Sequence, residues 1–252
     1  MKIQYCSDLH LEFPFNKTHL ALHPITPAGD ILLLAGDVML FTEINKHHEF
    51  LAWASDHFRE TYWVPGNHEY YGSDLSEQSL RLHEKLLPNV NLVNNVTLQL
   101  EDIQLVFSTL WSKINLEKEY SIKRTMADFH LIRKHGSKIT VTDYMELHET
   151  CLAFLKVTLE QTVLGKRLVV THHLPTYLNY PSRYLGSDLN SAFASELSDL
   201  VTLSGAAYWI FGHHHQPVPD FAIGNTVLTN NQLGYVQYGE HSSFSPEKLL
   251  KF

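Results

Sequence analysis

The sequence reads IQYCSDLH at residues 3–10 and ILLLAGD at residues 31–37. Each stretch starts with an apolar run of strand length and ends in a polar group that contains an aspartate. Short apolar runs of this kind are typical of strands that are buried on both faces. The two stretches therefore predict buried strands, each followed at its carboxyl end by polar side chains.

The pattern recurs along the chain and alternates with helical periodicity. We expect strands at residues 3–6, 31–35, 62–64, 105–107, 168–170, 208–211 and 226–228, and helices near 44–59, 74–87, 143–164 and 188–203. Ser73-Asp74 and Thr142-Asp143 are expected as N-caps. This order predicts an α/β fold, and the turn signals at Gly224-Asn225 and Gly234 indicate a partly antiparallel second sheet. No repeat or flexible linker interrupts the pattern, so residues 1–252 are expected to form one domain.

Composition excludes several classes of protein. The net charge of −8 argues against a protein that holds nucleic acid by bulk electrostatics. No apolar stretch approaches the roughly 18 residues of a membrane span, and the N-terminal residues lack a signal pattern. We therefore expect no membrane partner and a soluble, cytoplasmic protein. Cys6 and Cys151 are expected to be reduced thiols, because they are far apart and outside any CxxC spacing.

Histidine is unusually frequent, with 17 copies, and some of these residues belong to the polar groups that follow the expected strands. The groups are Asp8-Leu9-His10, Gly36-Asp37, Gly66-Asn67-His68-Glu69, Thr171-His172-His173 and Gly212-His213-His214-His215. Because sites in open α/β sheets form outside the carboxyl ends of the strands, the five groups are expected to converge on one centre. Oxygen and imidazole ligands without thiolates suit Mn, Fe, Zn, Co or Ni.

Local geometry refines this interpretation. Residues two apart in an extended strand face the same side, which predicts that Asp8 pairs with His10 and His213 with His215. The residue between each pair, Leu9 or His214, is expected to point elsewhere. The glycine in front of a ligand lets the backbone turn sharply beside the metal.

Taken together in this order, the motifs Asp-x-His, Gly-Asp, Gly-Asn-His-Glu, a His pair and Gly-His-x-His resemble the calcineurin-like metallophosphoesterase superfamily. The resemblance spans residues 8 to 215. It implies two mixed β-sheets packed as a sandwich flanked by helices, in four layers α/β/β/α, with two divalent metal ions at the strand ends. It also implies an enzyme that hydrolyses a small phosphomonoester or phosphodiester by attack of a metal-bridging hydroxide.

The resemblance also implies a role for each site residue. It assigns Asp8, His10 and His215 to one metal, Asn67, His172 and His213 to the other, and Asp37 to both. His172 is preferred to His173 because it directly follows the strand and Thr171, which leaves His173 behind the ligands or at the rim. His68 is expected to contact the phosphoryl oxygens and to protonate the leaving group. Glu69 either orients the residues around His68 or is a first-turn acid of the helix expected at 74–87.

One departure from the superfamily narrows the substrate. Protein Ser/Thr phosphatases continue Gly-Asp with a further Asp-Arg-Gly, whereas Val-Met-Leu-Phe follows Gly36-Asp37 here. Protein phosphatase activity is therefore disfavoured, and the chain more closely resembles the compact bacterial-type members.

Three features are candidates for substrate recognition. Residues 111–140 hold seven Lys/Arg and three acids: Lys113, Lys118, Lys123, Arg124, Arg133, Lys134 and Lys138, with Glu117, Glu119 and Asp128. This segment is either a cap or flap that gathers an anionic substrate or a solvated face. Arg183, among tyrosines, is either a phosphate contact or part of an exposed loop. Tyr70 and Tyr71 follow Glu69 and are candidates to touch the leaving group, and Trp111 either walls the cleft or packs in the core.

Two other functions stay open at this level. One is a nuclease of the same superfamily, which the net charge disfavours and the basic segment 111–140 keeps open. The other is a catalytically degenerate scaffold, against which the complete set of ligand types argues. The sequence does not indicate the native metals or the oligomeric state.

Overall fold

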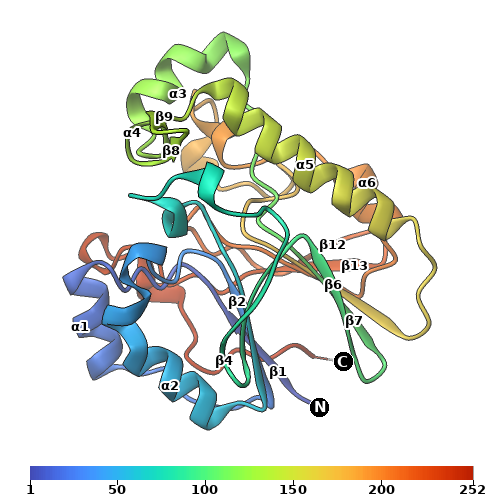
Figure 1. The fold of residues 1–252 in the computed structure, drawn as a ribbon. Helices are drawn as coiled ribbons and strands as arrows, with labels where there is room; N and C mark the ends of the chain where they lie inside the picture. Colours follow the sequence, from blue (N-terminus) through green and yellow to red (C-terminus); the bar gives the residue numbers. More distant parts are fainter. Residues whose placement is uncertain (252) are drawn as a thin grey trace.

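Two β-sheets face each other, and helices cover their outer sides (Figure 1). The structure, a computed structural model, describes residues 1–251. The first sheet has the strand order β1 (Ile3–Cys6), β2 (Ile31–Ala35), β3 (Glu60–Val64), β5 (Val90–Asn94) and β4 (Leu82–Leu87). The second has the order β12 (Phe221–Ile223), β13 (Thr226–Thr229), β11 (Tyr208–Ile210), β10 (Lys166–Thr171), β7 (Ile103–Ser108) and β6 (Val96–Leu100). Both sheets are mixed, because parallel central strands carry antiparallel strands at the edges.

Strand alternation divides the apolar residues between two sides of each sheet. Tyr5, Leu33 and Val64 of the first sheet meet Phe107 and Val170 of the second in the central core. The alternate residues point outward, so that each sheet has a second apolar face.

Helices cover these outer faces. The first sheet packs against α2 (His48–His57), through Leu34 and Leu51, and the second packs against α5 (Val141–Leu159) and α6 (Ser198–Leu203), through Val169 and Leu155. Another helix, α1 (Pro14–Leu22), lies beside α2 (Figure 1). The sandwich of mixed sheets flanked by helices, as predicted from the resemblance, is confirmed.

Local signals explain why α5 is the longest of the helices among the described residues. Thr140 caps it, because the Thr140 side chain accepts from the Asp143 backbone while Asp143 accepts from the Thr140 backbone. This reciprocal capping box satisfies N–H groups that a helix start leaves free. The helix therefore begins before the expected cap at Thr142-Asp143.

Two of the expected helices are wrong. Residues 74–87 form a short 3₁₀ helix (Leu75–Glu77) and strand β4, which pairs antiparallel with β5. The edge of β5 offers free backbone groups, and Leu82, Leu86 and Leu87 pack on the outer core, so tertiary pairing overrides local helix propensity. Residues 188–203 form a 3₁₀ helix (Asn190–Ala192) and then α6, because Leu174 bridges to Ala194 and interrupts the helical path.

Residues 111–140 fold at one end of the sandwich and include α3 (Glu119–Thr125), α4 (Asp128–Leu131), β8 (Arg133–Lys134) and β9 (Ser137–Lys138) (Figure 1). Ile122, Phe129 and Ile132 bury their side chains against the start of α5. The segment is thus tied to the sandwich by its own apolar cluster.

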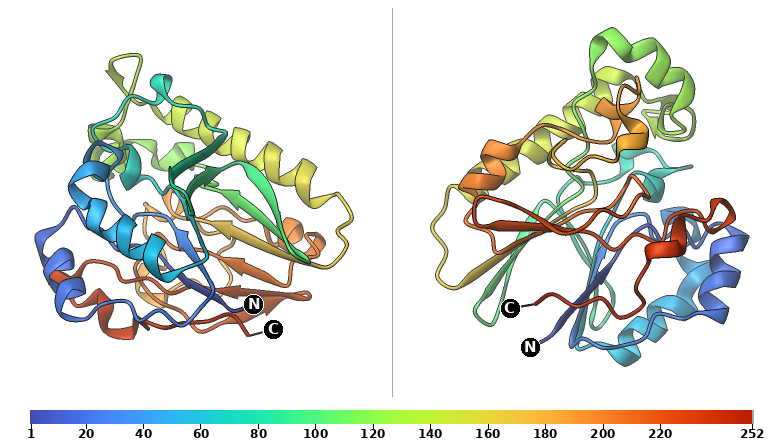
Figure 2. Two further views of the ribbon diagram at one scale, coloured as in Figure 1. Left: turned by 60° about the horizontal axis from the view of Figure 1, so that its bottom comes forward. Right: turned by 180° about the vertical axis from the view of Figure 1, so that it is seen from behind.

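The two ends of the chain lie close together (Figure 2). Gln4 in β1 bridges antiparallel to Leu249, and Ser7 bridges to Gln232. The last segment therefore closes the free edge of β1 and brings residues 232–240 beside the end of that strand. No helix among residues 1–251 combines the length and the apolar character that a membrane crossing requires.

Candidate metal centre

The polar groups singled out in the sequence meet at one edge of the sandwich. Asp8 and His10 follow β1, Asp37 follows β2, Asn67 follows β3, His172 follows β10, and His213 and His215 follow β11. Since these strands run parallel to their neighbours in each sheet, their carboxyl ends converge. All seven side chains are buried.

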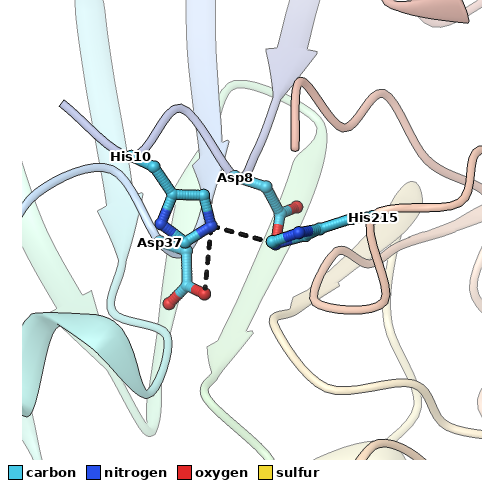
Figure 3. A group of neighbouring side chains, drawn as sticks. All are labelled: Asp8, His10, Asp37 and His215. Atoms are coloured by element: carbon cyan, nitrogen blue, oxygen red, sulfur yellow. Dashed lines mark hydrogen bonds and ion pairs between the residues drawn. The ribbon is translucent and has the colours of Figure 1, made fainter. Parts of the chain in front are cut away.

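One set of ligand atoms lies around the end of β1, and we call it the first metal group (Figure 3). It contains Asp8, His10, Asp37 and His215. His10 Nε2 lies 2.9 Å from His215 Nε2 and 3.7 Å from Asp37 Oδ2. His215 Nε2 lies 3.3 Å from Asp8 Oδ1.

The second metal group contains Asp37, Asn67, His172 and His213. His172 Nε2 lies 3.4 Å from Asp37 Oδ2, 3.2 Å from Asn67 Oδ1 and 3.1 Å from His213 Nδ1. Asp37 thus belongs to both groups, at the position that a bridging carboxylate requires. Burial would raise the pKa of Asp37, but His172, His68 and His10 hold it well below its ordinary value.

Hydrogen bonds fix the protons of the first metal group. His10 Nδ1 lies 3.0 Å from Glu12 Oε1, and His215 Nδ1 lies 2.9 Å from Glu240 Oε2. Because a carboxylate only accepts, each Nδ1 carries a proton, and each Nε2 points toward the other ligands of the group. The two Nε2 atoms lie 2.9 Å apart beside Asp8 and Asp37, a position that a shared cation would stabilise. The donor set therefore fits a metal ion.

The ligand backbones are strained. Asp8, His10, Asp37, His213 and His215 all have positive φ, between 47° and 81°. A left-handed residue that is not glycine costs about 1–3 kcal/mol and tends to occur at functional sites. The pairs Asp8/His10 and His213/His215 therefore converge through left-handed turns rather than through the extended strand that we expected.

Leu9 and His214, the residues between the paired ligands, lie outside both metal groups. Leu9 packs in the core beneath the first sheet. His214 is buried, and Gln232 Nε2 donates to its Nδ1 over 2.8 Å.

Gly66 and Gly36 permit the close approach of the two sheets. A Cβ on Gly66 would lie 2.2 Å from Asp37 Oδ1, and one on Gly36 would lie 2.2 Å from His172 Nδ1. Gly36 also has a φ of 91°. Any larger residue would displace a ligand, which is the physical reason for glycine in these motifs.

Glu69 holds the ligand loops together from beneath. Its carboxylate accepts from the backbone N–H groups of Asp37, Val38 and Gly66 over 3.0, 2.7 and 2.6 Å, and from Trp63 Nε1 over 3.0 Å. Burial and the nearby Asp37 raise its pKa to about 8, while these N–H donors favour the carboxylate. Of the two interpretations from the sequence, the structure favours the residue that orients the site.

His68 stands beside the metal groups and faces both Glu12 and Tyr235. Its Nδ1 lies 3.0 Å from Glu12 Oε1, and its Nε2 lies 3.2 Å from Tyr235 Oη. Burial would lower the pKa of His68, but Asp37, Glu12 and Asp128 raise it above its ordinary value. Burial would raise the pKa of Glu12, but hydrogen bonds from His10 and His68 lower it to about 2. Glu12 Oε1 therefore orients both His10, a candidate ligand, and His68 beside it.

Asp128 orients Asn67 from the segment 111–140. Asn67 Nδ2 donates to Asp128 Oδ1 over 2.9 Å, and Tyr71 Oη donates to the same oxygen over 2.6 Å. The Asn67 amide is thereby turned so that Oδ1 faces His172. The segment 111–140 thus contributes an acid to the site rather than a base.

His173 lies behind the second metal group. Its Nε2 lies 3.1 Å from Tyr144 Oη, and its ring contacts that of His213 at a centroid distance of 4.1 Å. His172, and not His173, points its free nitrogen at Asp37 and Asn67.

A cavity of about 700 Å³ opens over both metal groups. Its polar wall includes Asp37, Asn67, His68 and Tyr235. Its apolar wall is lined by Phe13, Leu40, Met126, Leu131, Leu189 and Phe193. The walls meet at His213, whose ring packs on that of Phe193 at 4.6 Å.

Two of the three residues proposed for substrate contact, Tyr70 and Arg183, are not in the cavity wall. Tyr70 is fully buried between Phe41 and Trp111, and its neighbour Tyr71 lines the cavity instead. Arg183 is exposed and donates to Tyr184 Oη, with its guanidinium 4.5 Å from the centre of that ring. The structure therefore brings neither side chain to the metals. Trp111 is also fully buried in the core.

The basic side chains of 111–140 do not line the cavity either. Lys118 pairs with Asp188, Lys123 with Glu119, and Lys134 with Asp143 and Glu146. The part of the segment that reaches the cavity is formed by Thr125, Met126, Ala127 and Leu131. These basic charges thus lie away from the cavity, and the wall that the segment forms over the metals is mostly apolar.

Comparison with known proteins identifies the family. The model of the family described as calcineurin-like phosphoesterase matches residues 1–217. The chain belongs to the calcineurin-like phosphoesterase family. It is a hydrolase of phosphate ester bonds whose cofactor is a pair of divalent metal ions, and the two metal groups fit that cofactor.

One sequence relative and one solved structure match nearly the whole length of this phosphoesterase. "Uncharacterized protein L509" of Acanthamoeba polyphaga mimivirus is 29% identical over 277 residues, which cover 97% of this chain and 94% of the viral protein. The crystal structure of the phosphopantetheinyl hydrolase of Mycobacterium tuberculosis has a TM-score of 0.72 at 17% identity, covering 99% of this chain and 95% of that one. The second likeness shows that the fold is shared.

Sequence reasoning missed four side chains that support the site: Glu12, Asp128, Tyr235 and Glu240. The sequence does contain a signal for Glu12. It follows His10 by two residues, which is the same spacing as that from Asp8 to His10. The other three sit outside any motif, and only the fold brings them beside the ligands.

Proposed function

We propose that this phosphoesterase hydrolyses a small phosphomonoester or phosphodiester at the two metal groups. In this proposal Asp8, His10 and His215 hold one ion, Asn67, His172 and His213 hold the other, and Asp37 is shared. The observation that carries it is the sharing of Asp37 by two converging ligand groups that open into one cavity beside His68.

Ions bound there would supply a hydroxide nucleophile at neutral pH and offset charge on the phosphoryl oxygens. Other side chains of the protein hold the ligands in place. Glu69 fixes the loop of Asp37, Asp128 turns Asn67, and Glu12 and Glu240 hold the tautomers of His10 and His215. Buried partners of this kind keep ligands in place before substrate arrives.

His68 is the proposed acid for the leaving group. Glu12 accepts from Nδ1 and favours the protonated ring, which leaves Nε2 free to donate toward the cavity. A leaving oxygen that occupies the position next to Tyr235 Oη would receive this proton. A general acid of this type contributes about 10²- to 10⁴-fold to the rate.

We do not propose a nuclease. No Lys or Arg is found among the described residues that line the cavity, and a nucleic acid backbone needs such cations. The structural neighbour from Mycobacterium tuberculosis is named a phosphopantetheinyl hydrolase, and at 17% identity it supports only the shared fold.

A cytoplasmic location stays a prediction, and manganese stays one of the five metals that suit the ligands. Cys6 and Cys151 are both buried and free, which agrees with a reducing compartment.

The test measures metal content and turnover on one preparation. The metal-free chain is loaded separately with Mn, Ni, Zn and Co, ions are counted per chain, and hydrolysis of p-nitrophenyl phosphate and of bis(p-nitrophenyl) phosphate is followed. We expect two ions per chain and turnover of at least one ester, lost with chelator and restored by metal. Two bound ions without turnover of either ester would instead indicate a metal-binding scaffold.

A further inference from the structure

The cavity over the metal groups lacks the cations that a highly charged substrate needs. Among its described lining residues there is no Lys or Arg, and the side chains that carry charge are acids and histidines. Arg183 is not itself a lining residue; it lies behind Tyr184, which lines the cavity and to which its guanidinium donates. Any negative charge of the substrate beyond the reacting phosphoryl group would therefore find no basic side chain in the wall.

Acidic side chains instead surround the metal groups. Glu12 and Glu240 line the cavity behind His10 and His215, and Asp8 and Asp37 belong to the metal groups themselves. Two divalent ions would bring about four positive charges, and these four carboxylates together with a hydroxide offset about five. A monoanion thus enters more readily than a dianion or a polyphosphate.

The rest of the cavity is shaped for an apolar group. Its volume of about 700 Å³ falls within the roughly 300–1,000 Å³ of pockets that hold organic ligands much larger than a phosphate. Met126 and Leu131 come from the segment 111–140, and Leu189 and Phe193 come from the loop after β10. Since Phe193 packs on His213, this wall starts at the second metal group and leads away from it.

From these two observations we propose that the substrate is a phosphodiester monoanion with one extended apolar ester group, which lies against Met126, Leu131, Leu189 and Phe193. The inference rests on the proposed function and selects between the two ester classes that it leaves open. Each methylene group that the wall removes from water would raise kcat/KM by up to about fourfold.

The test compares substrates that share one leaving group. The metal-loaded full chain is assayed with p-nitrophenyl phosphate and with the methyl, butyl and hexyl diesters of p-nitrophenyl phosphate. We expect kcat/KM to be higher for the hexyl diester than for the monoester and to rise by about 10-fold or more from methyl to hexyl. A preference for the monoester, or equal values for the three diesters, would overturn the inference and leave the proposed function standing. Failure to hydrolyse any of the four with two ions bound would overturn the proposed function itself.

A second experiment places a positive charge in the apolar wall of the cavity. Leu131 is 47% exposed, so Leu131→Lys is compatible with folding and adds a cation to the apolar wall. We expect it to shift the ratio of kcat/KM values from hexyl diester toward monoester by about fivefold or more. Leu116→Lys is the matched control, because Leu116 is 61% exposed on the same segment and does not line this cavity. Equal ratios in the two variants would contradict the assignment of the wall.

Discussion

The two metal groups lie at the same edge of the sandwich but have different partners behind their histidines. In the first group the outer nitrogens of His10 and His215 face the carboxylates of Glu12 and Glu240. In the second, His172 Nδ1 lies 2.8 Å from the Ala35 carbonyl and His213 Nε2 lies 3.4 Å from the Ala192 carbonyl. A carboxylate makes an imidazole more basic than a carbonyl does, so the first group should hold its ion more tightly. The second group also relies on Asn67, a neutral ligand.

The largest expected effect comes from the residue that the two groups share. Asp37→Asn removes the one carboxylate that lies within reach of both groups. We expect fewer than two ions per chain and a loss of turnover of more than about 10³-fold, while the sheet core still folds. Metal analysis, circular dichroism and a kinetic assay on one sample measure all three. Full activity with two ions retained would disprove the assignment of Asp37.

The second expected effect separates chemistry from metal binding. His68→Ala should retain both ions, because His68 contacts Glu12 and Tyr235 and belongs to neither metal group. If His68 protonates the leaving oxygen, kcat should fall by about 10²-fold or more on an alkyl phosphate ester and by less on an aryl ester that departs without a proton.

The contrast between the two leaving groups is the control for His68. Equal losses on both esters would point to stabilisation of the phosphoryl oxygens instead. Unchanged rates on both would remove His68 from the mechanism.

A smaller effect is expected from a substitution behind the histidines of the first metal group alone. Glu240→Gln keeps an acceptor for the Tyr235 N–H but takes the charge away from His215 Nδ1. We expect the affinity for one of the two ions to fall by about 10- to 100-fold and that for the other to stay as it was. Titration of the metal-free chain with a chelator-buffered ion measures both affinities. Equal weakening of both would show that the groups are not independent.

The sequence predicts which side chains gather at the strand ends, because strand ends and the polar groups that follow them are both local signals. The apolar run 31–35 and the Asp37 that follows it are read from one stretch, and the parallel order of the strands brings such stretches together. Strand β4 could not be read in this way, because residues 82–87 pair with β5 only when that edge is present. Its local pattern is compatible with a helix.

The supporting acids and the cavity wall depend on contacts between distant residues. Asp128 lies 61 positions from Asn67, and Glu240 lies 25 from His215, so no spacing rule links them. The basic residues of 111–140 are obvious in the sequence, whereas Met126 and Leu131, which reach the cavity, are ordinary apolar residues. Charge is visible in a sequence, but the direction in which a side chain points from a folded segment is not.

The smallest expected effect concerns His214, which lies between two ligands in the chain and belongs to neither metal group. Gln232 Nε2 donates to His214 Nδ1 over 2.8 Å, and Gln232 Oε1 accepts from the His215 backbone N–H over 2.8 Å. His214→Ala removes the first bond, but Gln232 Nε2 keeps a second acceptor, Asn230 Oδ1 at 3.3 Å. We therefore expect two ions per chain, as in the unmodified protein, and a loss of folding stability of about 1–2 kcal/mol, because a buried hydrogen bond and its packing are gone. His213→Ala and His215→Ala, prepared alongside, should each lose metal. Metal loss in all three variants alike would show that the left-handed turns of this loop do not direct His214 away from the ions.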